Sequence, residues 1–542
     1  MADTKVSRRS VLTCGTIVGI AALGGYAGMR LAGRAFEDLD LEIDPAIYTD
    51  PERDSIPVDS VISKRNDLYG KRPNIICILT DDMGYGDIGS YGGKSVSTPN
   101  IDRLAQEGTR FMSFYSCNAL CSPSRAGLMT GRYPHRTGVT FPIWPKDDSF
   151  VRKATRKFAE FMARIGAVDL IGGRSIADGL PQSEITISEA LKVAGYSTMA
   201  IGKWHLGDFT KQPEYHPHLH GFDRFVGFNA SNDDWPVAFW RDDKEIISDI
   251  GLDQEKYTGL FTEEAVGFIE DNKDNPFFLY VAHKDPHQPC FPSSDFKNVT
   301  EGGPHGDTIA EVDWSVGEIL ACLERNGLEE DTIILFTSDN GPWYNGSPGG
   351  FRGRKGQSYE GGFRVPLLAR WPGHIPRGGV CNEPAMNIDF FPTLLYLAGL
   401  DTPNDRVIDG ENIWGLLSGD EEESPHDALF FFHHNELEGV RDGKWKYYRR
   451  IHHYVHPVPN DKLNTFVGVV ATGSYSYSSE SEGGEDTSIS ILGSWPLLYN
   501  LDLDPGENYN VIKKYPEIGE QMQEKIEGWE EEFYKNPRGW LK

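Results

Sequence analysis

The stretch RPNIICILTDDMGYGD, residues 72–87, decides the predicted fold. Within it, Asn74–Thr80 is an unbroken apolar run with polar residues on both sides. Such a run is typical of a strand that is buried on both faces, as in a parallel sheet. Two later stretches have the same character, NPFFLYVAH at residues 275–283 and DTIILFTSDNG at residues 331–341.

Helical patterns lie between these runs. Residues 98–108, 186–195 and 310–327 have the apolar spacing of helices, and each segment ends at a glycine, which commonly stops a helix. Strands that alternate with helices predict an α/β sandwich built on a large, mainly parallel sheet.

The pattern changes from about residue 425. Residues 428–451 alternate between apolar and polar and contain RDGK, which is typical of a hairpin turn. Residues 496–507 continue this texture, and an amphipathic helix follows at 518–534, so we expect a smaller antiparallel sheet with a covering helix. The low-complexity segment at 473–488 predicts a flexible loop. The expected parts are a targeting or anchor segment (1–35), an acidic linker outside the fold (36–71), the main α/β domain (72–424) and the C-terminal subdomain (425–542).

The composition is that of a globular protein with a strong acidic excess. The chain has 542 residues and a formal net charge of −28, which excludes nucleic acid and anionic membranes as partners of the whole surface. An anionic substrate would need a local island of positive charge. Seven cysteines are thinly spread, so stability does not depend on a disulfide framework, and Cys77 fits a buried strand position.

The N-terminus contains SRRSVL at residues 7–12, followed by an uncharged, glycine- and alanine-rich stretch that reaches Met29. A twin-arginine pattern of this kind predicts export of the folded protein, to the periplasm or the exterior. The alternative is an N-terminal membrane anchor, which the glycines of the stretch disfavour. Apart from this segment we expect no stable membrane partner.

Two predicted strands end in oxygen-bearing side chains. Asp81 and Asp82 follow the first, and Asp339 and Asn340 follow the third. Ligands gather at the carboxyl ends of strands in open α/β sheets, and an all-oxygen cage suits Ca²⁺ or Mg²⁺ rather than zinc. Taken separately, each pair is also compatible with a turn or a helix cap.

The stretch LCSPSRAGLMTG, residues 120–131, predicts a short helix that begins near Cys121 and ends at Gly131. Arg125 then lies one turn after Cys121 on the same face. A reactive thiolate at a helix N-terminus is one interpretation of Cys121. The order of the residues supports another.

CSPSRAGLMTG resembles the signature of the sulfatase family at every fixed position. Five further family motifs follow the same order as in that family: TDDMGYGDIGSYG (80–92), GYSTMAIGKWHLG (195–207), DPHQP (285–289), SDNG (338–341) and GRKGQSYEGGFRVP (353–366). The chain is therefore identified as a member of the sulfatase family, most similar to its arylsulfatase branch within the alkaline phosphatase superfamily. The resemblance implies an alkaline-phosphatase-like sandwich and a sulfuric ester hydrolase.

The resemblance also implies roles for particular residues. Cys121 is the precursor of formylglycine, an aldehyde whose hydrate is the nucleophile, and a maturation enzyme must form it. One calcium ion lies against this residue and is held by Asp81, Asp82, Asp339 and Asn340. The residues that grip the sulfate and move protons are Arg125, Lys203, His205, His287 and Lys355, with Asp339 taking a proton from the nucleophile.

Two features depart from the family pattern. The segment between Thr140 and Gly179 is longer than usual and carries a basic run, FVRKATRKFAEFMAR, at residues 150–164. His433 and His434 stand where the C-terminal strand is expected to approach the site. Either feature can set substrate choice or form a solvated surface. We assign HPHLH (216–220) a structural or rim role, and Cys117 a role in core packing.

The substrate implied is a sulfated small molecule or glycan, either an aryl sulfate or a sulfated carbohydrate. Two alternatives stay open at this stage. The first is a phosphoesterase or phosphonate monoester hydrolase of the same superfamily, and the second is a non-catalytic sulfatase-like binding protein. The absence of a histidine-rich metal set near the strand ends favours the sulfatase.

Overall fold

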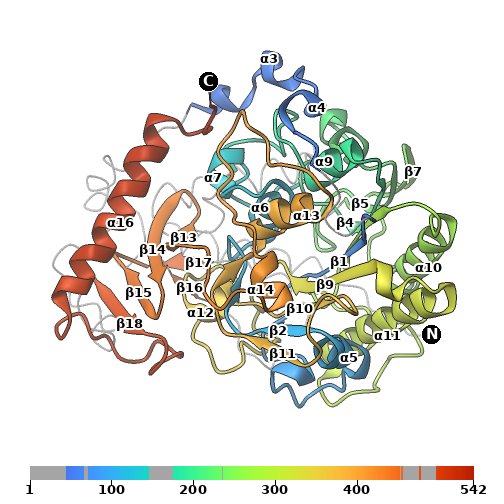
Figure 1. Cartoon of the computed structure of the whole chain (residues 1–542). Helices are drawn as coiled ribbons and strands as arrows, with labels where there is room; N and C mark the ends of the chain where they lie inside the picture. Colours follow the sequence, from blue (N-terminus) through green and yellow to red (C-terminus); the bar gives the residue numbers. More distant parts are fainter. Residues whose placement is uncertain are drawn as a thin grey trace, which may run out of the picture.

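The computed structural model describes residues 44–65, 71–145, 175–234, 236–451, 453–455, 475–477 and 496–541. Its centre is a ten-stranded sheet in the order β11-β2-β10-β9-β1-β8-β4-β5-β6-β7 (Figure 1). The five central strands β9, β1, β8, β4 and β5 are parallel, while β10 and β6 run antiparallel to their inner neighbours. The predicted mainly parallel sheet is confirmed. The strand bounds are β1 (Asn74–Thr80), β2 (Thr109–Phe111), β4 (Ser197–Lys203), β5 (Arg224–Phe228), β6 (Phe239–Arg241), β7 (Lys244–Ile247), β8 (Phe277–Ala282), β9 (Thr332–Ser338), β10 (Leu367–Arg370) and β11 (Gly379–Cys381).

The sheet is covered on both faces, which explains the apolar run of β1. Ile75, Cys77 and Leu79 belong to one hydrophobic core, whereas Ile76 and Ile78 belong to the other. Because successive side chains of a strand point to opposite faces, a strand between two cores needs apolar residues throughout. The first core contains residues of α6 (Cys121–Thr130), α9 (Ile187–Val193), α13 (Phe390–Leu397) and α14 (Trp414–Ser418), and the second contains residues of α5 (Pro99–Glu107), α10 (Tyr257–Asp271) and α11 (Gly303–Asn326).

Helix α11 begins seven residues before the predicted start at residue 310. The helix begins at Gly303, its second residue is Pro304, and Gly302 precedes it. Because glycine and proline together are typical of a loop, the sequence did not indicate a helix here. Proline is well suited to a first helical turn because its missing N–H has no partner there in any case. The remaining elements are η1 (Pro45–Tyr48), α3 (Pro51–Asp54), α4 (Val58–Val61), η2 (Gly89–Tyr91), β3 (Phe114–Tyr115), α7 (Pro134–Thr137), η3 (Pro213–Tyr215), η4 (Pro217–His220), η5 (Glu329–Asp331), α12 (Glu360–Phe363), β12 (Ala385–Met386) and η6 (Asn387–Asp389).

The smaller C-terminal sheet is confirmed. Strands β13 (Leu429–His433), β14 (Glu436–Asp442), β15 (Trp445–Tyr448) and β18 (Leu497–Asn500) are antiparallel throughout. Helix α16 (Pro516–Lys535) covers this sheet and buries Met522 and Ile526 in its core (Figure 1). Within the segment expected to be a loop, β17 (Tyr475–Tyr477) pairs with β16 (His453–Val455).

Residues 44–65 correct one expectation. This segment was predicted to lie outside the fold as part of an acidic linker, but Tyr48, Val61 and Ile62 are buried. The Tyr48 hydroxyl donates to the His135 carbonyl at 2.7 Å, and Arg538, near the C-terminus, donates to the Ile47 carbonyl at 3.2 Å. The chain ends beside α3 (Figure 1). Burial of Tyr48, Val61 and Ile62 attaches this otherwise polar segment to the folded domain.

The twin-arginine segment and the basic run at residues 150–164 lie outside the described residues. Among the helices that are described, none combines the length and apolar character that crossing a membrane requires.

Candidate active site

The sheet register brings the two oxygen-rich strand ends together. Thr80 at the end of β1 pairs with Ser338 at the end of β9, so the residues that follow each strand are neighbours. Asp339 Oδ1 accepts a hydrogen bond from the Asp82 backbone N–H at 3.2 Å, and Asn340 Nδ2 donates to Asp82 Oδ1 at 2.7 Å. The convergence predicted for these side chains is therefore present.

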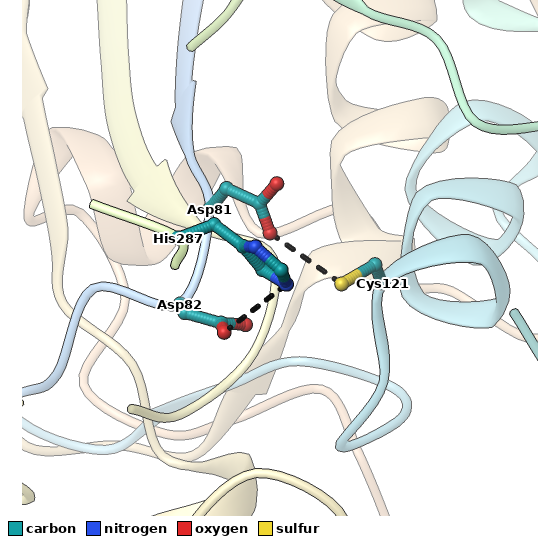
Figure 2. A group of neighbouring side chains, drawn as sticks. All are labelled: Asp81, Asp82, Cys121 and His287. Atoms are coloured by element: carbon teal, nitrogen blue, oxygen red, sulfur yellow. Dashed lines mark hydrogen bonds and ion pairs between the residues drawn. The ribbon is translucent and has the colours of Figure 1, made fainter. Parts of the chain in front are cut away.

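Cys121 is the first residue of α6, and it faces this edge of the sheet. Its Sγ lies 3.4 Å from Asp81 Oδ1 (Figure 2) and 3.3 Å from Lys355 Nζ. Every residue of α6 is buried, and the helix ends at Gly131, whose φ of 69° lies in the left-handed region. Because α6 is buried along its whole length, the packing around it restricts where the Cys121 side chain can lie.

Cys117 packs against the same helix, as predicted. A Cβ at Gly127 would lie 2.2 Å from Cys117 Sγ, so this position on α6 admits only glycine. Burial raises the pKa of the Cys117 thiol.

Three cations surround the carboxylates. Arg125 Nη2 lies 2.8 Å from Asp339 Oδ2, Lys203 Nζ lies 2.5 Å from Asp81 Oδ2, and Lys355 Nζ lies 2.7 Å from Asp82 Oδ1. The side chains of Arg125 and Lys203 are fully buried, and that of Lys355 is 12% exposed. An anionic ligand approaching from solvent therefore meets Lys355 before the other two.

The charges of the site nearly cancel. Three carboxylates face three permanent cations, so the site gains little attraction for an anion unless further positive charge is bound. Burial alone would raise the pKa of Asp81, but Lys203, His287 and Arg125 outweigh it and hold this pKa well below its usual range. Burial and the Asp81 charge raise the pKa of the Cys121 thiol well above its ordinary value, so the reactive-thiolate interpretation is not supported.

The two predicted histidines lie at the same site. His287 Nε2 is 3.6 Å from Asp82 Oδ2 (Figure 2), and its Nδ1 is 2.5 Å from the Gln288 carbonyl. His205 is 2% exposed, and neither ring nitrogen has a hydrogen-bond partner, although Nε2 lies 3.5 Å from Asp234 Oδ2. A buried imidazole without hydrogen bonds is costly, and the charges that act on this ring are those of Lys203, Arg125 and Asp81, so a ligand bound among them would supply the missing partner.

Two residues of the site adopt left-handed backbone conformations. Asp82 has a φ of 63° and His205 a φ of 58°. Residues other than glycine pay for this conformation, and such residues are enriched at active sites and ligand-binding turns. Both positions were already predicted from their motifs.

Sequence analysis missed three residues here. Ser231 Oγ lies 3.0 Å from Lys203 Nζ, and Asp233 Oδ1 lies 4.0 Å from His287 Nδ1. Asp234 approaches His205 from the same turn. These residues follow β5, another parallel strand, so the strand-end rule that selected Asp81 and Asp339 could have found them.

The residues present can hold a divalent cation, and the donors that lie closest to one another are two carboxylates, a thiol and an imidazole. Side-chain atoms of Asp81, Asp82, Cys121 and His287 lie within 4.8 Å of one another. Asn340 Oδ1 is buried and has no hydrogen-bond partner among the described residues, as expected of an amide oxygen that serves as a metal ligand. The Asp339 carboxylate faces Arg125 and stands outside this group of four, whereas His287, which was not predicted as a ligand, belongs to it.

The other histidines noted in the sequence lie elsewhere. His216 and His220 pack on Phe209 and Trp204 and belong to the rim of the sheet. The rings of His433 and His434 stack at 4.2 Å, and His434 contacts Phe141 at 4.7 Å between ring centroids. Ile143 lies two residues after Phe141, and its backbone N–H donates to the Oγ of Ser122, the residue after Cys121, at 3.0 Å. His434 is thus connected to the active-site helix through the segment from Phe141 to Ile143.

Family models match almost the whole described chain. The model described as sulfatase matches residues 73–400, and that described as the C-terminal region of aryl-sulfatase matches residues 424–539. A model described as the C-terminal part of N-sulphoglucosamine sulphohydrolase matches residues 351–457.

Individual relatives agree with these models. The chain is 35% identical over 461 residues to N-acetylgalactosamine-6-sulfatase of Rattus norvegicus, covering 81% of each chain. It is 31% identical over 525 residues to steryl-sulfatase of Mus musculus, covering 80% of this chain and 78% of the relative. Among solved structures, a sulfatase from a Pseudoalteromonas species aligns with a TM-score of 0.70 and 27% identity, covering 90% of this chain and 96% of the other. A Bacteroides thetaiotaomicron protein of glycosaminoglycan metabolism aligns with a TM-score of 0.67 and 27% identity, covering 84% and 99%.

Proposed function

Since this chain belongs to the sulfatase family and is a sulfuric ester hydrolase, we propose that it cleaves a sulfated carbohydrate with a formylglycine derived from Cys121 and one bound calcium ion. The observation that carries the proposal is the convergence of Cys121 with three carboxylates, three cations and two histidines at one sheet edge.

The aldehyde proposal rests on the position and protonation of Cys121. The thiol is held at the head of a rigid helix, yet its raised pKa makes it a poor nucleophile as cysteine. When formed, the hydrated aldehyde supplies one hydroxyl to attack sulfur and a second that allows sulfate to leave. The conversion requires a formylglycine-generating or equivalent maturation enzyme.

The calcium proposal rests on the donor set and on charge. Asp81, Asp82, Asp339 and Asn340 offer carboxylate and amide oxygens, the donors that Ca²⁺ prefers. A bound divalent cation would supply the positive charge that the balanced site lacks for an anionic ester.

The cations of the chain bind and orient the ester. Lys355 and Lys203 lie beside Cys121 and Asp81, where they neutralise sulfate oxygens, and the Arg125 guanidinium fixes Asp339 through two hydrogen bonds to Oδ2, at 2.8 and 3.0 Å. As in phosphoryl transfer, positioning and charge neutralisation supply most of the catalysis. We assign Asp339 the proton of the attacking hydroxyl.

The two histidines divide the proton transfers. His287 is 10% exposed in its side chain and lies on the solvent side of the site, so its Nε2 is placed to protonate the departing sugar oxygen. His205 is buried, and burial together with Lys203 lowers its pKa well below the ordinary value. A neutral His205 is able to accept a proton at the end of the cycle.

A carbohydrate substrate is supported by the relatives. Five mammalian N-acetylgalactosamine-6-sulfatases are 35–38% identical to the chain, and the structure of a relative at 28% identity is a complex with neocarrahexaose. Steryl-sulfatases of Mus musculus and Homo sapiens are 31% and 34% identical and an arylsulfatase of Hemicentrotus pulcherrimus is 35% identical, so aryl sulfates belong in the test of this proposal.

The closing experiment has three readouts on the mature protein. Mass analysis of the peptide that contains Cys121 should show the aldehyde, and metal analysis should show one calcium per chain. Sulfate release should be detected from at least one sulfated sugar in a panel that also holds aryl sulfates, a phosphonate monoester and a phosphodiester. Activity on the phosphorus esters alone would replace this proposal, and no turnover at all by aldehyde-containing protein would indicate a binding protein.

We also propose twin-arginine export, on the basis of SRRSVL. Changing both arginines, Arg8→Lys with Arg9→Lys, should leave the precursor in the cytoplasm of its native host. Normal export of this variant would contradict the proposal and favour another secretion route or an anchor.

A further inference from the structure

The loop that carries Lys355 is fixed on its active-site side by the backbone. The Lys355 N–H donates to the Pro342 carbonyl at 3.0 Å, and the Gly356 N–H donates to the Ala119 carbonyl at 2.9 Å. Ala119 precedes the helix that begins at Cys121. Movement of this loop would therefore change the distance between Lys355 and Cys121.

The C-terminal subdomain fixes the other side of the same loop. Tyr448 on β15 contacts the Ser358 carbonyl at 2.8 Å, and Glu507 Oε2 accepts the backbone N–H of Glu360 at 2.7 Å. The Arg352 guanidinium donates to the Glu507 carbonyl at 3.0 Å. Glu507 and Tyr448 are fully buried, so water does not replace these contacts.

The hydrogens of this group can be counted. Tyr448 Oη lies 2.8 Å from the Ser358 carbonyl and 2.5 Å from Glu507 Oε1. A phenol has one hydrogen, so Tyr448 cannot donate fully to both oxygens. Both contacts are hydrogen bonds at the same time only when Glu507 is a neutral carboxylic acid that donates to Tyr448 while Tyr448 donates to Ser358.

The surrounding charges favour this state. Glu360 lies 2.6 Å from Lys446 Nζ and 2.9 Å from Arg364, whereas Glu507 is 3.8 Å from Lys446. Burial raises the pKa of Glu507 to about 7, Lys446 offsets this only in part, and the Glu360 charge adds to it. Two neighbouring carboxyl groups with unequal access to cations separate into one ionised and one neutral group. The titratable and charged groups that face Glu507 are Arg352, Tyr359, Glu360, Lys446, Tyr448 and Tyr499.

We propose that Glu507 is a positioning residue for Lys355, which holds the Lys355 loop as a neutral acid and releases it on ionisation. Once the proton is lost, both oxygens of Glu507 can only accept, and the Tyr448 hydrogen turns from Ser358 to Glu507. The Ser358 carbonyl then loses its donor, and the loop is held less firmly. The inference rests on the proposed function, since it is there that Lys355 contacts the substrate.

The test is the pH dependence of kcat/KM for Glu507→Gln. A glutamine keeps the acceptor for the Glu360 N–H and gives Tyr448 an N–H donor at every pH. With both proteins normalised at acidic pH, the activity of the variant should exceed that of the wild type at alkaline pH, by up to about tenfold one unit above the pKa of Glu507. Superimposable profiles from two folded proteins would overturn the proposal.

The matched control is Glu189→Gln. Burial also raises the pKa of Glu189 to about 7, but this residue caps α9 through hydrogen bonds to Thr186 at 2.9 Å. Its pH profile of kcat/KM should equal that of the wild type. If Glu189→Gln changes the pH profile of kcat/KM as much as Glu507→Gln does, the loss of activity at alkaline pH does not depend on the Lys355 loop. This result would also overturn the proposal.

Two further measurements keep the test independent of folding and of activity. Tyr448→Phe removes the relay at every pH, so its kcat/KM should be lower and should lack the alkaline loss assigned to Glu507; a profile that keeps this loss contradicts the proposal. Folded Glu507 keeps its proton between the unfolded value of 4.5 and about 7, so the stability of the wild type falls as pH rises through this window. The Tm of Glu507→Gln should fall less over this window than that of the wild type, because Glu189 and Glu311 keep their own contributions to the fall. An equal fall in both would refute the neutral acid even if no sulfate ester were cleaved.

Discussion

Two buried clusters of charge lie on either side of the Lys355 loop, and they differ in how completely their polar atoms are paired. At Cys121, both ring nitrogens of His205 and Oδ1 of Asn340 have no hydrogen-bond partner in the part of the chain that the structure describes. At Glu360, each carboxylate oxygen is paired, Oε1 with Lys446 and Oε2 with Tyr115 and Arg364.

This difference indicates that the Cys121 cluster binds a ligand, whereas the Glu360 cluster stabilises the structure around it. An unpaired buried polar group costs about 1–3 kcal/mol, and a gathering of such groups around one set of charges is what a bound ligand or ion would satisfy. The paired cluster needs nothing further, and its contacts with Ser358 and the Glu360 backbone transmit order to the neighbouring loop. Changes in the first cluster should therefore lower activity and spare stability, and changes in the second should lower stability and affect activity only through the Lys355 loop.

The largest expected effect is that of Cys121→Ser in the first cluster. A serine is close in size but is not oxidised by a maturation enzyme that acts only on the cysteine thiol, so in a host with such an enzyme kcat should fall by at least about 10⁴-fold. The Tm should stay near that of the wild type because the buried hydroxyl keeps Asp81 as its partner. Turnover assays and thermal unfolding check both parts. A serine variant with appreciable multiple turnover would show that the aldehyde is dispensable.

The second cluster should respond in stability. Lys446→Met removes the cation 2.6 Å from Glu360 and leaves that carboxylate buried with fewer partners. The free energy of unfolding should fall by about 3 kcal/mol, measured by denaturant titration. Lys355→Met is the matched control in the first cluster, where calcium is expected to compensate Asp82, and it should lower kcat/KM with little change in stability. Equal loss of stability in both variants would remove the distinction between the clusters.

The first cluster was largely predictable from sequence, and the second was not. The bounds of β1 were predicted to the residue because burial on both faces leaves a local signature, an unbroken apolar run. Asp81 and Asp339 could be placed together because neighbouring parallel strands end at one edge of a sheet. Ser231 and Asp233 escaped because β5 is short and begins with the charged Arg224, so it does not resemble a buried strand.

The pairing of Glu360 with Glu507 has no local signature. The two residues are 147 positions apart, and each is an ordinary glutamate in its own segment. Only tertiary packing shows that one meets Lys446 closely and the other does not. The same limit applies to residues 44–65, whose buried Tyr48 and Ile62 are too far apart to form a periodic pattern.

A smaller effect is expected for His205→Ala, which tests the meaning of an unpaired buried group. Loss of a positioned proton acceptor should lower kcat by about 10²–10³-fold. The Tm should rise or stay constant, because the wild-type imidazole is buried without a hydrogen bond in the unliganded protein. A marked fall in Tm together with nearly normal turnover would assign His205 to the structural class instead.

The smallest effect is expected at the solvent-exposed edge of the active site, where the Asp233 carboxylate faces water. Asp233 is 46% exposed in its side chain and lies 4.0 Å from His287 Nδ1, the ring nitrogen that is not assigned to the leaving sugar. Its charge should repel a second sulfate group on the substrate, with an energy of about 0.5–1 kcal/mol because solvent screens it. Asp233→Asn should therefore raise kcat/KM for a disulfated sugar about 2–5-fold relative to a monosulfated one, and the gain should shrink at high salt. Asp243→Asn, an exposed carboxylate in the turn between β6 and β7, is the control and should change neither ratio. If Asp233→Asn changes kcat/KM equally for both substrates, the Asp233 carboxylate acts on His287 rather than on the substrate. Asp233 would then be part of the buried catalytic cluster and not a contact for the exposed end of the substrate.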